Sequence, residues 1–299
     1  MLCWAAWLPP SAGVRTVDSL GVAQAAYSPF TALSRGAEKT DHFYFAFMRA
    51  SKDLRGDAEQ NSLGIAMNPE FLLLGVIWYI VFLFSTTCHE GAHALAAKLG
   101  GDPTAFHGGQ VSLNPWPHIQ REPIGMVVVP ILSYIMAQWM IGWASTPYDP
   151  SWQQRYPRRA AWMALAGPAA NFSLMIVAGL AIHAGIFFRL LAPPSSANFT
   201  HIVDATTPGI AGLAATFLSV IFVLNLLLGT FNLLPFPPLD GSNAITLLMT
   251  DEAALKFLNF TRQGFGILGL FLAWYLFGKV FYRVFVFALN LLYPGSGYG

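Results

Sequence analysis

Long apolar runs recur along this 299-residue chain. A helix needs about 20 mostly apolar residues to cross the roughly 30 Å hydrocarbon core of a bilayer. Runs of that length occupy residues 71–99, 124–143, 162–188, 210–234 and about 264–292. The pattern predicts an all-α multi-pass membrane protein with about five hydrophobic segments.

The last apolar run differs from the others because Lys279 and Arg283 lie near its middle. Long basic side chains can extend toward the headgroups from a spanning helix, or can lie on the polar face of a helix in the interface. The run is therefore either one long tilted helix or a crossing followed by an interfacial helix.

The first 66 residues are mixed in polarity, contain scattered Pro and Gly residues, and lack a sustained helical or strand period. We expect residues 1–66 to be a poorly structured N-terminal extension and residues 67–299 to form one membrane domain. Met67 directly precedes the first apolar run and is a candidate initiator. The alternative is a translated, disordered extension.

Composition supports this organisation, since 55% of the residues are hydrophobic and only 10% are charged. A net charge of +1 gives no reason to expect nucleic acid as a partner. Two cysteines, Cys3 and Cys88, are too few and too far apart for a disulfide framework. The expected surroundings are the lipid bilayer, and the oligomeric state is left open.

Three titratable side chains interrupt the first apolar run, in the pentapeptide HEGAH. His89 and His93 are four residues apart, so on a helix they share one face and can hold one metal ion. Glu90 lies about 100° around the axis, where it can reach a metal-bound water without being a ligand. The alternative is a pair of core histidines bonded to neighbouring helices, but unligated polar groups are costly at membrane depth.

A catalytic zinc ion needs a third protein ligand, and Asp240 follows the fourth apolar run in the stretch LPFPPLDGS. Pro235, Pro237 and Pro238 cannot continue a regular helix. Irregular backbone at membrane depth is tolerated where protein or a water-filled cavity surrounds it. We therefore expect Asp240 to point into a cavity; the alternative is an ordinary Asp-Gly turn.

In combination, these motifs resemble the site-2 proteases, which are intramembrane zinc metalloproteases. HEGAH, ALAGPAANF at 164–172 and FNLLPFPPLDGS at 231–242 occur in the family's order. GGQVSLNPWPHI resembles the segment that follows HExxH in compact prokaryotic members. The resemblance extends over roughly residues 67–299.

The resemblance implies one Zn²⁺ ion bound by His89, His93 and Asp240. It implies Glu90 as the general base and Asn232 as the residue that positions the scissile carbonyl or its oxyanion. The expected substrate is a membrane protein or peptide, and the expected location is the cell (inner) membrane of a prokaryote. We interpret the basic cluster Arg155, Arg158 and Arg159 as a topology anchor at a membrane edge rather than a binding site.

Two further segments receive separate interpretations. Residues 110–113 predict a short strand against which an extended substrate could pair. Asn171 lies among small residues that let helices approach closely, so we interpret it as a structural or supporting residue.

The number of crossings constrains the topology. If the three apolar runs between His93 and Asp240 all crossed, the two residues would reach opposite faces of the membrane. An even number of crossings must therefore separate them. The run 124–143 is the best candidate for a re-entrant segment, because Pro130 interrupts its helix and glycines weaken its ends. We predict that it returns residues 146–149 to the face it entered from, as a re-entrant or short β-hairpin region.

Two classes of function remain on the sequence alone. The first is an active protease. The second is a catalytically silent zinc-binding membrane protein that acts as a partner-binding or chaperone-like module. A metal transporter is disfavoured, because glutamate at the second HExxH position is what hydrolysis requires.

Overall fold

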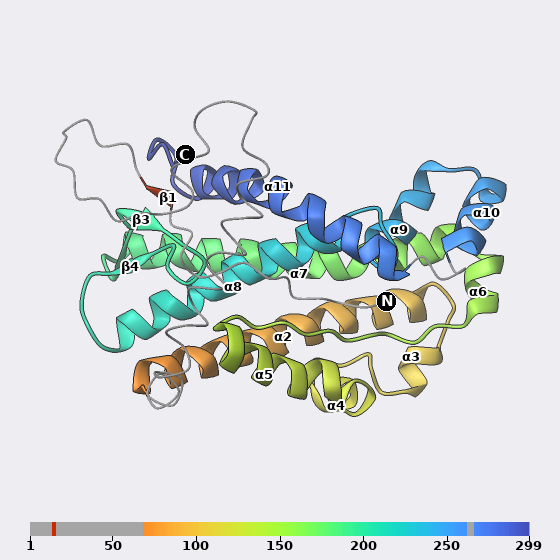
Figure 1. The fold of residues 1–299 in the computed structure, drawn as a ribbon, viewed down its shortest axis with the longest axis horizontal. Coiled ribbons are helices and arrows are strands. Elements are labelled where there is room, and N and C mark those ends of the chain that lie inside the picture. The colour runs from red at the N-terminus through yellow and green to blue at the C-terminus, as the bar shows by residue number, and fades with distance from the viewer. Residues whose placement is uncertain (1–13, 16–67, 262–265, 299) are drawn as a thin grey trace.

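The computed structural model describes residues 14–15, 68–261 and 266–298. Within these ranges, the helices long and apolar enough to cross a membrane are α2 (Pro69–Leu99), α7 (Pro157–Phe187), α8 (Ile210–Asn232) and α11 (Gly266–Leu292). They lie lengthwise beside one another (Figure 1). This confirms the predicted all-α multi-pass membrane class. The extension 1–66 and Met67 lie outside the described residues, apart from residues 14–15.

Successive long helices run in opposite directions. Close packing of α8 on α7 joins Gly229 to Phe172 at one level and Phe222 to Gly179 at another. The rings of Phe231 and Phe277 are 5.0 Å apart, which places the end of α8 beside the first half of α11. The C-terminal end of α2, the start of α7 and the end of α8 therefore meet at one end of the bundle.

Local sequence explains where the long helices begin. The Asn68 side chain accepts a hydrogen bond from the Glu70 amide at 2.9 Å, and Pro69 takes the first helical position of α2. Helix α7 begins at Pro157, five residues before the predicted apolar run, because its first turns carry arginines that a hydropathy pattern leaves out. Helix α11 is continuous, which resolves the alternatives for the last run in favour of one long helix.

The run 124–143 forms a hairpin rather than a crossing. Its first arm is a π-helical segment, η2 (Ile124–Val128), followed by α5 (Val129–Ala137). Gln138 then takes a left-handed conformation with φ of 54°, and the chain returns without regular secondary structure. The Trp143 amide donates to the Gly125 carbonyl at 3.0 Å, so the two arms lie against each other. The predicted re-entrant path is present.

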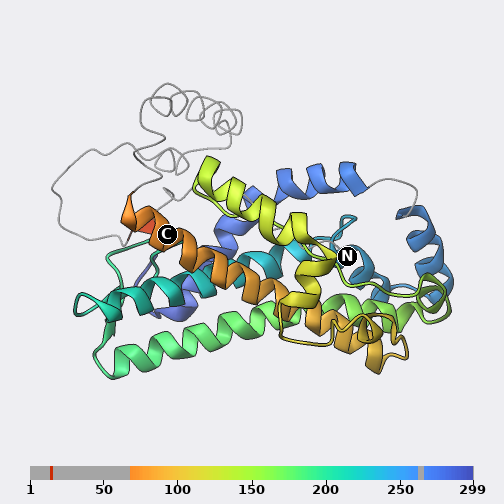
Figure 2. The ribbon, with the colours of Figure 1, turned by 90° about the horizontal axis from the view of Figure 1, so that it is seen from below.

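The hairpin packs along α2, beside which it lies in both views (Figures 1 and 2). Near its tip, the Tyr134 hydroxyl donates to the Phe71 carbonyl at 2.7 Å. The Trp139 ring lies 4.9 Å from that of Trp78. A hairpin that starts and ends at the same level of α2 leaves two crossings, α7 and α8, between His93 and Asp240, as the parity argument requires.

Short elements connect the long helices at the end of the bundle where α2 finishes. They are α3 (Thr104–His107), α4 (Trp116–Arg121), α6 (Pro150–Arg155), α9 (Asp240–Ala244), the 3-10 helix η3 (Ile245–Leu248) and α10 (Asp251–Thr261). Arg159 donates to the Gly100 carbonyl at 3.1 Å, and Arg158 pairs with Asp251 at 3.0 Å. Two of the three clustered arginines thus tie α7 to its neighbours.

At the other end of the bundle lie two-residue strands. Strand β2 (Leu191–Ala192) pairs antiparallel with β4 (Asp204–Ala205), and β3 (Ser196–Ala197) pairs antiparallel with β1 (Val14–Arg15).

The predicted short strand at residues 110–113 is wrong: this segment is a series of bends. Ser112 Oγ accepts from the Asn114 amide at 3.0 Å, and Asn114 Oδ1 accepts from the Trp116 amide at 3.0 Å. Such local side-chain bonds to the backbone compete with strand pairing. The Ser112 carbonyl instead packs on Gly91, where an added Cβ would lie 3.1 Å from it.

Candidate metal centre

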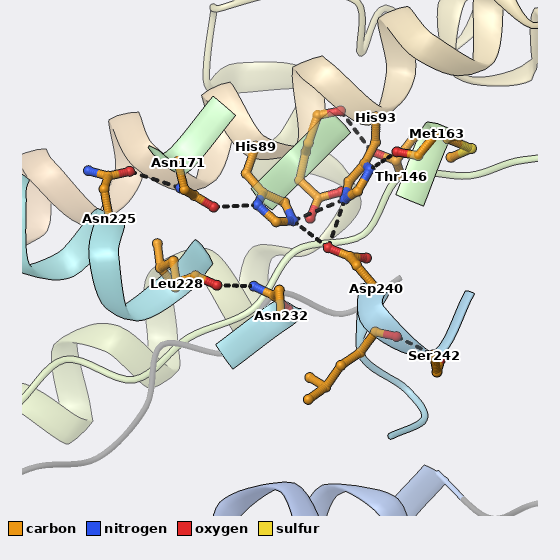
Figure 3. A network of polar contacts seen from close by, with 12 residues as sticks. His89, His93, Thr146, Met163, Asn171, Asn225, Leu228, Asn232, Asp240 and Ser242 are labelled. Atoms are coloured by element: carbon orange, nitrogen blue, oxygen red, sulfur yellow. Dashed lines mark hydrogen bonds and ion pairs between the residues drawn. The ribbon is translucent and has the colours of Figure 1, made fainter. Parts of the chain in front are cut away.

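Three buried side chains from two distant parts of the sequence converge at one point (Figure 3). His89 and His93 come from α2, and Asp240 begins α9. Asp240 Oδ2 lies 3.0 Å from His89 Nε2 and 3.1 Å from His93 Nε2. The two Nε2 atoms are 3.0 Å apart. These separations suit atoms that share one ion through bonds of about 2.1 Å.

The outer nitrogen of each histidine has its own partner. His93 Nδ1 lies 2.7 Å from the Met163 carbonyl, and His89 Nδ1 lies 2.6 Å from Asn171 Oδ1. A histidine whose Nδ1–H is donated outward presents the Nε2 lone pair inward, which is the form that binds metal. Asn171 therefore orients a candidate ligand, in agreement with its interpretation as a supporting residue.

The surroundings of the three side chains fit a metal ion. A Cβ added at Gly167 would lie 2.5 Å from His89 Nε2 and closer still to His93 Nε2, so glycine keeps this space open. Asp240 Oδ1 is buried and has no hydrogen-bond partner among the described residues. A buried carboxylate oxygen without a partner is costly, and a bound cation would satisfy it.

Glu90 lies next to this centre and receives a partner from the hairpin. Thr146 Oγ1 lies 2.7 Å from Glu90 Oε2 and 3.0 Å from the Glu90 carbonyl oxygen. Glu90 is fully buried, and no described residue bonds its other oxygen, Oε1. Thr146 holds one carboxylate oxygen and leaves the second for chemistry. This contact could not be predicted from the sequence, because a single threonine after an apolar run belongs to no motif.

Asn232 is the last residue of α8 and is buried close to the three converging side chains (Figure 3). Its Nδ2 donates to the Leu228 carbonyl at 3.0 Å, one turn earlier in the same helix. Its role in positioning a carbonyl or oxyanion stays a prediction.

The histidines left off the predicted metal set lie elsewhere. His118 is buried with Nε2 3.2 Å from the Ser112 carbonyl, and His201 pairs with Asp204 at 2.9 Å. In the described part of the chain, the group found able to hold a metal is His89, His93 and Asp240.

Comparison with known proteins agrees with this geometry. The family model described as Peptidase family M50 matches residues 77–275, which include all three converging side chains and Glu90. The chain belongs to peptidase family M50. This is the site-2 protease family, so the earlier resemblance is confirmed and the protein is a metallopeptidase.

The chain is also similar to the Bacillus subtilis (strain 168) protein named "Putative zinc metalloprotease YwhC". It is 30% identical over 187 residues, which cover 62% of this chain and 75% of the relative. No solved structure matches the chain with significance.

Proposed function

We propose that this M50 metallopeptidase is an intramembrane zinc protease that hydrolyses peptide bonds within or near the transmembrane segments of membrane-protein substrates. The observation that carries the proposal is the convergence of His89, His93 and Asp240 beside Glu90, inside a bundle of apolar helices. His89, His93 and Asp240 would hold one zinc ion. Bound zinc lowers the pKa of its water to near 7 and polarises a carbonyl oxygen.

Glu90 supplies the proton transfers. Its Oε1 accepts the proton of the attacking water, while Thr146 holds Oε2. Glu90 then returns the proton to the leaving amine. The Asn232 amide would donate to the carbonyl oxygen of the substrate, on which negative charge develops.

The substrate must reach the site in an unwound form. The peptide bonds of a helix are shielded by the helix's own turns and bonded along its axis. A transmembrane substrate therefore has to unwind locally before Glu90 can act on it. Substrates whose helices are weak are the preferred class.

The distribution of basic residues supports one orientation of the bundle in the membrane. Basic residues gather around the site end of the bundle: Lys98, Arg121, Arg155, Arg158 and Arg159. Lysine and arginine are enriched in cytoplasmic loops. We place the site end toward the cytoplasm, in the cell membrane of a prokaryote.

Purified protein in proteoliposomes tests the function, with Glu90→Gln compared against wild type on a single-span model substrate. We expect one zinc per chain in both proteins, and cleavage at least about 100-fold slower in the variant, because it retains the ligands and loses the base. Glu252→Gln, on the exposed face of α10, is the matched control and should cleave like wild type.

Two results would contradict the proposal. Equal cleavage by Glu90→Gln and wild type would show that Glu90 is not the base. Zinc in wild type without cleavage of any membrane substrate trapped by the variant would favour a silent zinc-binding module.

A further inference from the structure

A chain of buried amides leads away from His89 across three helices (Figure 3). His89 Nδ1 lies 2.6 Å from Asn171 Oδ1 on α7, and Asn171 Nδ2 donates to Asn225 Oδ1 on α8 at 2.8 Å. Asn225 Nδ2 donates to Ser85 Oγ at 2.9 Å. Ser85 lies on α2 one turn before His89, so this series of hydrogen bonds begins and ends on the same helix. The three linking residues beyond His89 are fully buried.

The far end of this chain fixes the direction of every bond in it. Asn225 Nδ2 also donates to the Ile221 carbonyl at 2.9 Å, and a backbone carbonyl can only accept. The NH₂ group of Asn225 must therefore face Ile221, so its oxygen faces Asn171. Asn171 must then turn its own NH₂ toward Asn225 and its oxygen toward His89.

The direction of the bonds decides where His89 carries its proton. An oxygen at Asn171 requires an N–H at His89 Nδ1, which leaves the Nε2 lone pair facing Asp240 Oδ2. If Asn171 were reversed, its NH₂ would require an acceptor at Nδ1. The proton would then lie on Nε2, the atom that must bind the metal.

We propose that Asn225 is a positioning residue that sets the tautomer and ring orientation of His89 through Asn171. The inference rests on the zinc site of the proposed function. His93 needs no such chain, because its Nδ1 lies directly against a backbone carbonyl, Met163 O, at 2.7 Å. The side-chain amide of Asn171 can rotate, so its orientation has to be fixed by its other hydrogen-bond partner, Asn225.

Two substitutions separate this role from simple packing. Asn225→Leu keeps the approximate volume but removes both donor and acceptor. Asn225→Asp is expected to be protonated in this buried position. Its hydroxyl can donate to Ile221 O while its carbonyl oxygen accepts from Asn171, which preserves the bond directions.

The experiment measures zinc affinity of the full-length protein by competition with a chelator, together with the absorption spectrum of the Co²⁺-substituted protein. Loss of a residue that orients a metal ligand directly costs about 10- to 100-fold in affinity. Asn225 acts on His89 through one intervening residue, so Asn225→Leu should lower zinc affinity about 10-fold and alter the Co²⁺ spectrum. The zinc affinity of Asn225→Asp should stay within about 3-fold of wild type. Thermal unfolding of the metal-free proteins shows whether each variant is folded.

The outcomes are distinguishable. Wild type that binds no zinc would overturn the proposed function itself. Wild type that binds zinc, with a folded Asn225→Leu of equal affinity, would overturn the role of Asn225 alone. Equal losses in Asn225→Leu and Asn225→Asp would also overturn it, because bond direction would then not matter.

Discussion

Thr146 Oγ1 lies 2.7 Å from Glu90 Oε2, so the return arm of the hairpin holds the residue that we assign as the general base. The contact joins two segments that are 56 residues apart in the chain. It makes the hairpin part of the site rather than a packing element beside it.

Thr146→Val should lower the turnover number by about 10- to 100-fold, because valine fills the same space without a hydroxyl to hold the carboxylate. Zinc content and KM should remain close to wild type. Steady-state cleavage kinetics and metal analysis measure these quantities. Thr146→Ser retains the hydroxyl and should recover most of the turnover; a serine variant as slow as the valine variant would contradict this account.

Gly167→Ala should reduce zinc content strongly, because the added methyl group collides with Nε2 of both histidines. We expect zinc affinity to fall at least about 10-fold, with cleavage falling in parallel. Gly278→Ala, in α11, is the matched control, since nothing lies within 4 Å of a Cβ added there. Retention of wild-type zinc affinity by Gly167→Ala would mean that the ion does not lie between these side chains.

Asp240→Asn should weaken zinc binding by about 100-fold or more, exceeding the loss expected for a residue outside the ligand set. The amide that replaces the carboxylate carries no charge to balance the ion. Asp251→Asn removes an aspartate whose side chain is exposed in a pair with Arg158 and should bind zinc like wild type. Chelator competition compares the three proteins, and equal affinities would remove Asp240 from the ligand set.

Single cysteines at Glu122 and Asp149 should be labelled from the same side of a sealed membrane, because the hairpin starts and ends at one level of α2. A cysteine at Glu70, at the opposite end of α2, should be labelled only from the other side. Cys3 and Cys88 are replaced first. Labelling of positions 122 and 149 from opposite sides would falsify the re-entrant path.

Much of the fold follows from local sequence, because membrane helices are specified by length and apolarity. The runs that contain α2, α8 and α11 were predicted almost to their ends. The hairpin was predicted from a constraint between distant residues, since His93 and Asp240 can meet only if an even number of crossings separates them. The strand at 110–113 was wrong, because Ser112 and Asn114 bond to nearby amides, an effect that strand propensity does not include.

The candidate metal set was also visible in sequence, since a helical HExxH fixes its own geometry and a proline-rich break marks Asp240. The contacts of Thr146 and Asn225 were not. Each depends on which side chains the packing of distant segments brings within 3 Å of a carboxylate or an amide. Neither residue belongs to a motif that carries chemistry by itself.

The separation of His93 from Asp240 by 147 residues has a consequence for biosynthesis. The histidines and Glu90 enter the membrane with α2, but Asp240 follows only after α7 and α8 have been made. A nascent chain that carries HEGAH therefore lacks the third side chain of the centre until two further helices are in place. The three side chains of the candidate metal centre therefore cannot come together before α7 and α8 have joined α2.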